Sequence, residues 1–405
     1  MRIAFVVPRF YPYRGGYENS ILWLARGLVK KGHRVTVFTT TAYDLEAFWL
    51  PEFRTLAAGT ENVEGIAVHR FPISYQKWIR RSLRTLSFLP NWRIKARFGK
   101  PSFLVPGLRQ ALVNEKPEII HIGPLPYNSL MYEGLRMGRQ LHSRVIATPC
   151  THFGVEDETE VAQFYTQEFQ IEMLKRCDGV IAMTKAERQR LSNLGVSPEK
   201  VVSVNYGIDP AAVSNGYGDC FRQKHNIDGP VVLHLGTKAQ DKGTMSVVEA
   251  MKLLWNKGSR AWLVLAGSSL SEFDNYLTRN SRPPRLLNLP AVDDEEKRDL
   301  LAATTVLAHP SRVESFGLVY LEAWANGKPV IGSDTAVSRE VITDQEDGLL
   351  VPFGDVPALA AAIDRLLSDP GAADRMGTRG KHKLYDRFCW NVTAPKIYAV
   401  FTPSI

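Results

Sequence analysis

The sequence has little cysteine and no long apolar run. Its four cysteines, Cys150, Cys177, Cys220 and Cys389, lie far apart and form no C-x-x-C pair. This spacing argues against a disulfide framework and a zinc ribbon, and it fits a reducing compartment. No apolar stretch approaches the roughly 20 residues that a membrane-spanning helix needs. Met1 leads into a strand-like run without a charged leader and cleavable apolar core, so we expect a cytoplasmic protein.

Several common ligand-binding motifs are also absent. The chain contains no G-x-G-x-x-G fingerprint of nicotinamide binders, no P-loop and no D-x-D or His/Asp cluster typical of a metal site. We therefore expect no bound metal and no cofactor. The composition is that of an ordinary globular protein, with 44% hydrophobic and 23% charged residues, which excludes a long disordered chain.

Positive charge is concentrated in the first half of the chain. Residues 1–200 hold 28 Lys and Arg against 18 Asp and Glu, whereas residues 201–405 hold 22 against 24. Between 77 and 100 there are eight basic and no acidic residues, interleaved with Trp and Leu. Four of the basic residues share one face at helical spacing: Lys77, Arg80, Arg81 and Arg84. This face suits an anionic membrane surface, and a solvated basic loop over a core is the alternative. Nucleic acid is not expected, because no nucleic-acid-binding motif accompanies the patch.

Short apolar runs alternate with helical patterns along the whole chain. Strands are predicted at 2–7, 34–39, 66–71, 118–122, 144–148, 179–183, 201–204, 230–235, 261–266, 286–289, 305–309, 329–332 and 348–351. Helices are predicted between them, among others at 17–31, 244–256, 293–303 and 316–326. This alternation predicts an α/β fold of two doubly wound, Rossmann-like domains, because parallel strands need crossover helices. The break falls near 207–229, which is rich in Gly, Asn and Asp.

Three strand-to-helix loops carry candidate chemistry. Paired glycines, Gly15 and Gly16, follow the first strand and allow backbone N–H groups to approach a ligand. Lys238 and Lys242 follow the strand at 230–235, where two ammonium groups can neutralise a diphosphate. Glu314 precedes a predicted helix that carries Glu322 two turns on, about 12 Å away at helical rise. Each of the first two loops also fits a plain turn.

The phrase from Glu314 to Glu322 resembles the E-x7-E signature of retaining glycosyltransferases with the GT-B fold, in particular family 4. Other phrases resemble that family in the same order along almost the whole chain. They are Gly15-Gly16 with Glu18, Gly32-His33-Arg34-Val35, Tyr206-Gly207-Ile208-Asp209, Val292-Asp293-Asp294-Glu295, Gly327-Lys328-Pro329-Val330 and Phe388-Cys389-Trp390. The resemblance implies a first domain over 1–205 and a nucleotide-sugar-binding domain over 206–387. It also implies that a helix at about 388–405 crosses back onto the first domain.

The resemblance assigns roles residue by residue. Glu314 would contact the donor sugar and Glu322 the ribose, with Val292 near the base. Phe316, Gly317 and Leu318 would lie against the sugar and the diphosphate, Lys242 would bind the diphosphate, and Gly15 and Gly16 would close over the phosphates.

The chain departs from the family pattern at three places. Thr237 stands where the family has Arg, so Lys238 is the candidate substitute. Tyr206 replaces an Asn. The family's active-site His is two residues displaced, which makes His152 the candidate to contact the sugar or the acceptor. His121, at a strand end, is interpreted as structural.

The sequence thus predicts a retaining, metal-independent glycosyltransferase. Its donor would be a nucleotide diphosphate sugar, UDP- or GDP-linked, that gives a hexose to an acceptor hydroxyl. The acceptor would be a lipid-linked or cell-surface glycan precursor, reached by a protein peripheral to the inner face of the cell membrane. The alternatives are a non-catalytic, membrane-docked partner with the same fold and a nucleotide-sugar epimerase.

Overall fold

The computed structural model describes residues 1–405 except 14, 76–89, 100–102, 153–159, 281–282 and 403–405. The chain divides into two compact units. The first comprises Met1–His152, Glu160–Asn205 and the stretch from Ala394 onward, and the second comprises Tyr206–Thr393. The chain returns to the first unit inside its last helix, whereas the sequence places that return at about 388.

The first unit is built on an eight-stranded sheet. Its strands are β1 (Arg2–Val6), β2 (Arg34–Thr40), β3 (Gly59–Val63), β4 (Ile66–Phe71), β5 (Ile119–Ile122), β6 (Arg144–Ala147), β7 (Gly179–Ala182) and β8 (Val201–Ser203). They lie in the order β3-β4-β2-β1-β5-β6-β7-β8, and β3 alone is antiparallel to its neighbour. The sequence analysis missed β3, because this edge strand buries only Val63 and so shows no apolar alternation.

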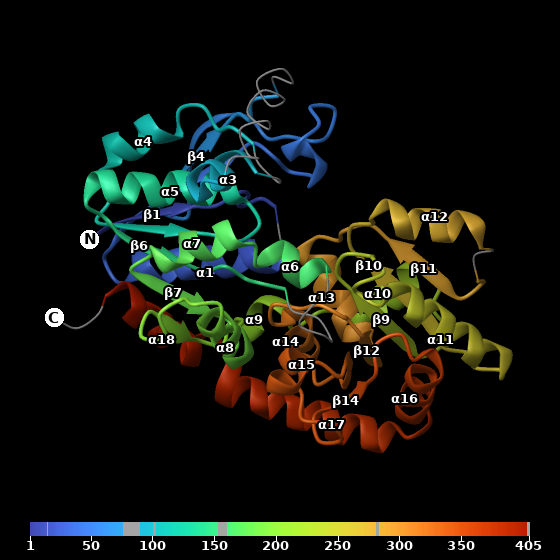
Figure 1. The fold of residues 1–405 in the computed structure, drawn as a ribbon. Coiled ribbons are helices and arrows are strands. Elements are labelled where there is room, and N and C mark those ends of the chain that lie inside the picture. The colour runs from blue at the N-terminus through green and yellow to red at the C-terminus, as the bar shows by residue number, and fades with distance from the viewer. Residues whose placement is uncertain (14, 76–89, 100–102, 153–159, 281–282, 403–405) are drawn as a thin grey trace. The chain divides into compact units, whose positions relative to one another are not determined.

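Helices connect these strands in the first unit. They are α1 (Gly16–Lys30), the short η1 (Glu46–Phe48), α3 (Trp92–Phe98), α4 (Leu108–Glu115), α5 (Asn128–Leu141), α6 (Glu160–Tyr165), α7 (Glu168–Lys175) and α8 (Lys185–Asn193). The last helix, α18 (Trp390–Phe401), ends in this unit, red beside blue and green elements in Figure 1. Its carbonyl at Val400 accepts a hydrogen bond from Arg144 at 2.7 Å, and the Phe401 ring lies 5.9 Å from that of Phe5.

The second unit holds a six-stranded, wholly parallel sheet. Its strands are β9 (Val231–Leu235), β10 (Trp262–Ala266), β11 (Leu286–Leu289), β12 (Val306–His309), β13 (Val330–Ser333) and β14 (Gly348–Val351), in the order β11-β10-β9-β12-β13-β14. Its helices are α9 (Pro210–Val213), α10 (Gly218–Lys224), α11 (Thr244–Asn256), α12 (Ser271–Arg279), α13 (Asp294–Ala303), α14 (Leu318–Ala325), α15 (Ala336–Val341), α16 (Val356–Ser368), α17 (Pro370–Lys383) and η2 (Leu384–Phe388).

The predicted fold class is confirmed. Every predicted strand is present, with ends shifted by at most about one residue. The central strands β1, β5, β9 and β12 are buried along almost their whole length, as expected for parallel strands covered on two faces.

Each sheet has one point where its strand order reverses, between β1 and β5 in the first unit and between β9 and β12 in the second. In open parallel sheets the crevice at the carboxyl ends of such a strand pair is where ligands bind. Gly15 and Gly16 follow β1, Lys242 follows β9, and Glu314 follows β12. The fold therefore brings the candidate residues to these two edges.

Candidate donor site at the carboxyl edge of the second sheet

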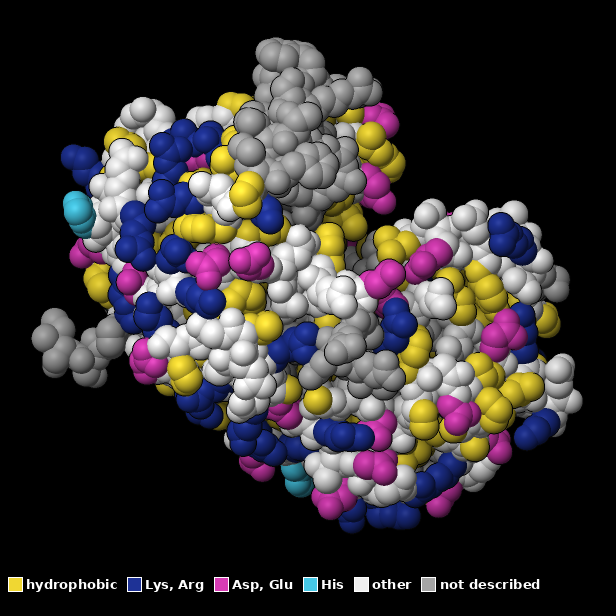
Figure 2. All heavy atoms as spheres, in the orientation of Figure 1, with side chains coloured by type: hydrophobic (Ala, Val, Ile, Leu, Met, Phe, Trp, Pro, Cys, Tyr) yellow, Lys and Arg dark blue, Asp and Glu magenta, His cyan; other side chains and the backbone are white. Residues whose placement is uncertain are grey.

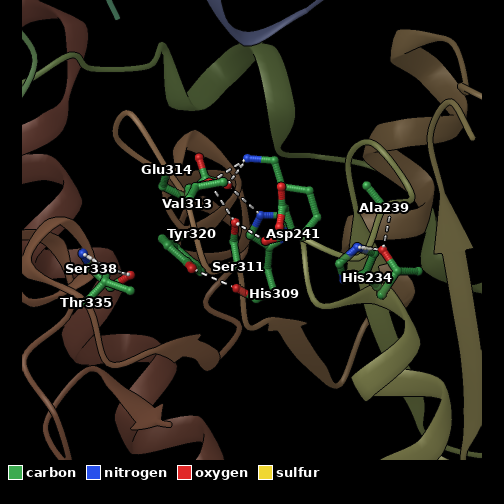
Figure 3. A network of polar contacts seen from close by, with 12 residues as sticks. His234, Ala239, Asp241, His309, Ser311, Val313, Glu314, Tyr320, Thr335 and Ser338 are labelled. Atoms are coloured by element: carbon green, nitrogen blue, oxygen red, sulfur yellow. Dashed lines mark hydrogen bonds and ion pairs between the residues drawn. The ribbon is translucent and has the colours of Figure 1, made fainter. Parts of the chain in front are cut away.

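The loops after β9 and β12 are bonded to each other. The backbone N–H of Arg312 donates to the carbonyl of Asp241 at 2.7 Å, and the two side chains form an ion pair. Gly243 has a φ of +71°, and a Cβ there would lie 2.3 Å from the carbonyl oxygen of Pro310, so only glycine fits. Figure 3 shows Asp241, Ser311 and Glu314 in one network. These contacts hold the loop after β9 against the loop after β12.

Glu314 is the centre of that network. Its Oε1 accepts from the Lys242 ammonium at 2.7 Å and from His309 Nε2 at 2.9 Å, and Lys242 also donates to the carbonyl of Val313 at 2.9 Å. Burial alone would raise the pKa of Glu314, but the Lys242 charge and the His309 hydrogen bond outweigh it and hold that pKa well below its ordinary value. Glu314 is therefore a fixed, ionised carboxylate.

A second histidine, the buried His234, packs against His309. The ring of His234 stacks on that of His309 with centroids 5.0 Å apart. His234 bonds the carbonyl of Ala308 at 3.0 Å and the hydroxyl of Thr244 at 2.9 Å, which also accepts from the N–H of Ala239 (Figure 3). Burial and the nearby His309 lower the pKa of His234 to about 3, so this ring is neutral. The stacked ring of His234 thus helps to orient His309 toward Glu314.

Helix α14 begins beside Glu314 with an uncapped amino end. Its N-cap is Gly317, at φ +89°, and no side chain bonds the first-turn N–H groups as a cap. A Cβ at Gly317 would lie 2.5 Å from the ring of Tyr320, whose hydroxyl donates to the carbonyl of His309 at 2.8 Å. First-turn N–H groups carry partial positive charge and bind anions. The helix thus offers donors to a phosphate near Leu318.

The helix starts later than predicted, and this corrects one distance. The sequence predicts a helix over 316–326, with Glu322 about two helical turns after Glu314, but α14 covers only Leu318–Ala325. Glu314 and Phe316 lie in the preceding loop, because the left-handed Gly317 breaks the helical path. The estimate of about 12 Å from helical rise therefore does not apply. Phe316 is buried, with its ring 5.8 Å from that of Phe388.

Glu322 lies in α14 and is paired with a lysine of α13. Its Oε1 lies 2.5 Å from the ammonium of Lys297, and Glu322 is 7% exposed. Asn326, one turn on, donates to the backbone carbonyls of Glu322 and Val213, both at 3.0 Å. Val292 is half-buried just before α13. Glu322 is therefore held between α14 and the helix that follows Val292.

Lys238 lies elsewhere in the second unit. Its side chain is almost fully buried, and its ammonium donates to the side chain of Asn288 and the carbonyl of Leu289, both at 2.7 Å. Burial lowers the pKa of Lys238 to about 8. These bonds join the β9 loop to the end of β11, so in this structure Lys238 is committed to the scaffold rather than to the Lys242–Glu314 network.

The glycine loop of the first unit begins α1. Gly15 is the N-cap, with extended backbone and no capping side chain. Glu18, in the first turn, is 6% exposed and lies 3.3 Å from Arg9 Nε, while the Arg9 guanidinium stacks 3.7 Å above the Tyr13 ring. Gly16 is the first residue of the helix. This edge therefore holds an ion pair and a cation–ring contact beside uncapped N–H groups.

The two histidines of the first unit have different surroundings. His121 is fully buried between the rings of Phe5 and Phe401, its Nε2 bonds the Thr148 hydroxyl at 2.8 Å, and burial lowers its pKa to about 3. It is structural, as interpreted. His152 is partly exposed, and its ring lies 4.6 Å from that of Tyr165.

The buried Glu187 fixes the backbone next to His152. Its carboxylate accepts from the N–H and the hydroxyl of Thr151 and from the N–H of Met183. The loop that carries His152 is thereby tied to the end of β7.

The predicted basic face, Lys77, Arg80, Arg81 and Arg84, lies outside the described residues. Of that segment the structure describes α3, where Trp92 packs on the first core, 6.1 Å from the Tyr132 ring and 4.2 Å below the Arg176 guanidinium. Trp92 is thus part of the protein's own packing. Figure 2 shows Lys and Arg gathered over the first unit, and basic and acidic side chains mixed over the second. In the part of the chain that the structure describes, we find no helix long and apolar enough to cross a membrane.

Sequence analysis overlooked two residues of the second-unit site, His309 and Lys297. His309 ends a buried strand five residues before Glu314. A polar residue at the carboxyl end of a buried strand is the sequence feature that could have indicated its role. Lys297 carries no such signal, because in the sequence it is one charge among several in an acidic and basic helix.

Comparison with known proteins agrees with this architecture. A family model described as glycosyl transferase 4-like domain matches residues 15–207, and one described as glycosyl transferases group 1 matches residues 219–383. An uncharacterised glycosyltransferase of Methanocaldococcus jannaschii is 26% identical over 99% of this chain and 98% of its own. A phosphatidyl-myo-inositol mannosyltransferase of Mycobacterium leprae is 25% identical over 99% and 96%.

Solved structures share the fold. The structure of HepE from Anabaena in complex with UDP and glucose superposes with a TM-score of 0.74 and 18% identity, over 100% of both chains. The chain thus carries a glycosyl transferase 4-like domain followed by a group 1 domain, and it is a glycosyltransferase with the GT-B fold.

Proposed function

We propose that this glycosyltransferase moves a hexose, with retention and without a bound metal, from a nucleotide diphosphate sugar to an acceptor hydroxyl. The observation that carries the proposal is the cluster of Lys242, Glu314 and His309 beside the amino end of α14. It lies at the edge where a doubly wound sheet binds ligands. One relative is named a glycosyltransferase and another a phosphatidyl-myo-inositol mannosyltransferase, and HepE was crystallised with UDP and glucose.

The charges of this edge suit a diphosphate leaving group. Lys242 is a compact cation held at the loop end, and the first-turn N–H groups of α14 add partial positive charge. Together they stabilise the negative charge that develops on the nucleoside diphosphate as the glycosidic bond breaks, which is electrostatic catalysis by fixed groups. Glu314, ionised and bonded to His309, faces the sugar. Val292, Phe316, Gly317, Leu318 and Glu322 complete the donor site of the proposal.

Lys238 contributes to the proposed site indirectly, by fixing the β9 loop. Gly15 and Gly16 contribute N–H groups toward the phosphates from the first unit, and His152 contacts the sugar or the acceptor. The acceptor of the proposal is a glycan or lipid-linked precursor. It is reached at an anionic membrane surface through the basic segment that contains Lys77, Arg80, Arg81 and Arg84.

A thermal-shift panel tests the proposal. Wild type is heated with UDP, GDP, ADP and dTDP, each with and without Mg²⁺. A nucleotide at 100 times its Kd adds about 2.7 kcal/mol to the free energy of unfolding. We expect one diphosphate to stabilise the protein equally in both conditions. Stabilisation that requires Mg²⁺ would contradict metal independence, and no stabilisation by any nucleotide would overturn the donor site.

Lys242→Met is the informative variant, and Lys252→Met is its matched control. Both lysines pair with a glutamate in the second unit, but Lys252 pairs with Glu249 within α11, at 2.9 Å, where both side chains are partly exposed. We expect Lys242→Met to abolish the shift and Lys252→Met to retain it. Anionic liposomes at low salt test the membrane part separately, because a protein that ignores them has no such surface.

A further inference from the structure

Each acid of the Glu314–Glu322 pair has its own lysine. Glu314 is paired with Lys242 at 2.7 Å, and Glu322 is paired with Lys297 at 2.5 Å. Three of these four side chains come from the β9 and β12 loops and α14, which sequence analysis assigned to the donor site. Lys297 comes from α13 and belongs to no motif. A role for it therefore needs a separate argument.

We infer that Lys297 is a positioning residue for the nucleoside, which holds the Glu322 carboxylate in the orientation that accepts the ribose hydroxyls. This inference rests on the proposed function, in which Glu322 meets the ribose. A carboxylate with one oxygen fixed by an ammonium keeps its second oxygen in a set direction, and Glu322 is nearly buried, so few other rotamers are open to it.

A nucleoside diphosphate is strongly anionic, and two bare carboxylates at its site would repel it at short range. Lys242 neutralises one of them, and Lys297 neutralises the other. The Lys297 side chain is only 20% exposed, so water screens this pair weakly. The ion pair thus makes an acidic side chain compatible with an anionic ligand.

Lys297 lies in the first turns of α13, which Asp293 caps through the N–H of Glu296 at 2.9 Å, directly after Val292. The ion pair therefore ties the helix that follows the base loop to the helix that carries Glu322. We expect base and ribose contacts to depend on each other through this link.

The test combines variants of Lys297 with nucleotides that lack a ribose hydroxyl. Kd values of the preferred nucleoside diphosphate and of its 2′-deoxy and 3′-deoxy forms are measured by calorimetry for wild type, Lys297→Met, Lys297→Arg and Lys224→Met. Lys224 of α10 is the matched control, because it pairs at 2.6 Å with Glu296, the neighbour of Lys297 in α13, and its own side chain is exposed. Lys297→Arg keeps the positive charge, so it remains informative if Lys297→Met fails to fold.

We expect wild type and Lys224→Met to lose about 10-fold to 100-fold in affinity when the bonded hydroxyl is removed. Lys297→Met should bind the parent nucleotide about 10-fold or more weakly and show little further loss with the deoxy form, while Lys297→Arg recovers much of the wild-type pattern. Donor KM should rise in Lys297→Met while kcat changes little, since a ground-state contact is affected.

Two results would overturn the inference. One is a folded Lys297→Met protein that loses as much affinity as wild type when the ribose hydroxyl is removed. The other is a wild-type protein that loses no affinity when either ribose hydroxyl is removed. If wild type binds no nucleotide at all, the proposed function itself fails, and that outcome is distinct from both.

Discussion

The two sheets present different chemistry at equivalent edges. In the first unit, the edge next to β1 holds the Arg9–Glu18 pair, with the guanidinium stacked on Tyr13 and the rings of Tyr13 and Tyr43 5.5 Å apart. In the second unit, the edge between β9 and β12 holds lysine–glutamate pairs and an uncapped helix end. One doubly wound unit thus carries an edge of stacked rings around a single Arg–Glu pair and the other an edge of lysine–glutamate pairs, and the residues of their strand-to-helix loops make this difference.

This difference predicts which changes affect chemistry and which affect stability. In the second unit the acids are expected to meet the substrate, so neutralising them should lower turnover. In the first unit Glu18 is almost fully buried against Arg9, so disrupting that pair should mainly lower the free energy of unfolding.

The largest expected effect is on Glu314. Glu314→Gln removes the fixed charge beside the proposed sugar position, and we expect kcat to fall about 10²-fold to 10³-fold, as when one preorganised electrostatic group is lost. Steady-state transfer from the nucleotide sugar measures it. Glu249→Gln, which affects a partly exposed lysine–glutamate pair of the same unit, is the control and should leave kcat unchanged. Equal losses in the two variants would contradict the role of Glu314.

The next largest effect concerns the first unit. Arg9→Met leaves the Glu18 carboxylate buried without its partner, which costs about 3–5 kcal/mol of unfolding free energy. Urea denaturation measures the loss. Adding Glu18→Gln to the same chain should recover much of it, because the unpaired charge is gone. A double variant as unstable as Arg9→Met would show that packing on Tyr13, and not charge, governs this edge.

Glycine substitutions compare the two helix starts directly. Gly317→Ala meets the Tyr320 ring at a left-handed φ, so we expect a loss of about 1–3 kcal/mol. Gly15→Ala has an ordinary φ, and its Cβ would meet the Glu18 carboxylate at 2.2 Å and the Tyr13 ring at 3.0 Å, so its loss comes from these contacts and not from backbone strain. Gly327→Ala, at φ +67° with open space, isolates the backbone cost. If Gly317→Ala costs no more than Gly327→Ala, the contact with Tyr320 is unimportant.

The last prediction concerns the pH dependence of stability. His121 and His234 have pKa values of about 3 in the folded units, below the ordinary 6.5. As pH falls below 6.5, the unfolded chain takes up protons that the folded chain does not, so stability falls by up to about 1.4 kcal/mol per pH unit for each histidine. His121→Gln should flatten this slope for the first unit alone between pH 6 and pH 4. An unchanged slope would mean that His121 is protonated in the folded protein.

The sequence predicts the sheets well and the site partly. Buried apolar runs predict the parallel strands to within about one residue. A glycine followed by a helical pattern predicts where the strand-to-helix loops lie. The edge strand β3 is invisible because four of its five residues are exposed.

Side-chain partners were harder to predict. Lys238 and Lys242 are four residues apart in one loop, yet only the fold shows that one ammonium meets Asn288 and the other meets Glu314. Lys297 and Glu322 are 25 positions apart and lie on two different helices, and no local pattern encodes their pairing.

Hydrogen exchange of the full chain with and without its preferred nucleoside diphosphate tests the central claim most directly. The account predicts that the nucleotide slows exchange of backbone amides in residues 236–243 and 314–319, the two loops and the helix start that carry Lys242, Glu314 and Gly317. Nucleotide binding with no change in either segment would contradict it.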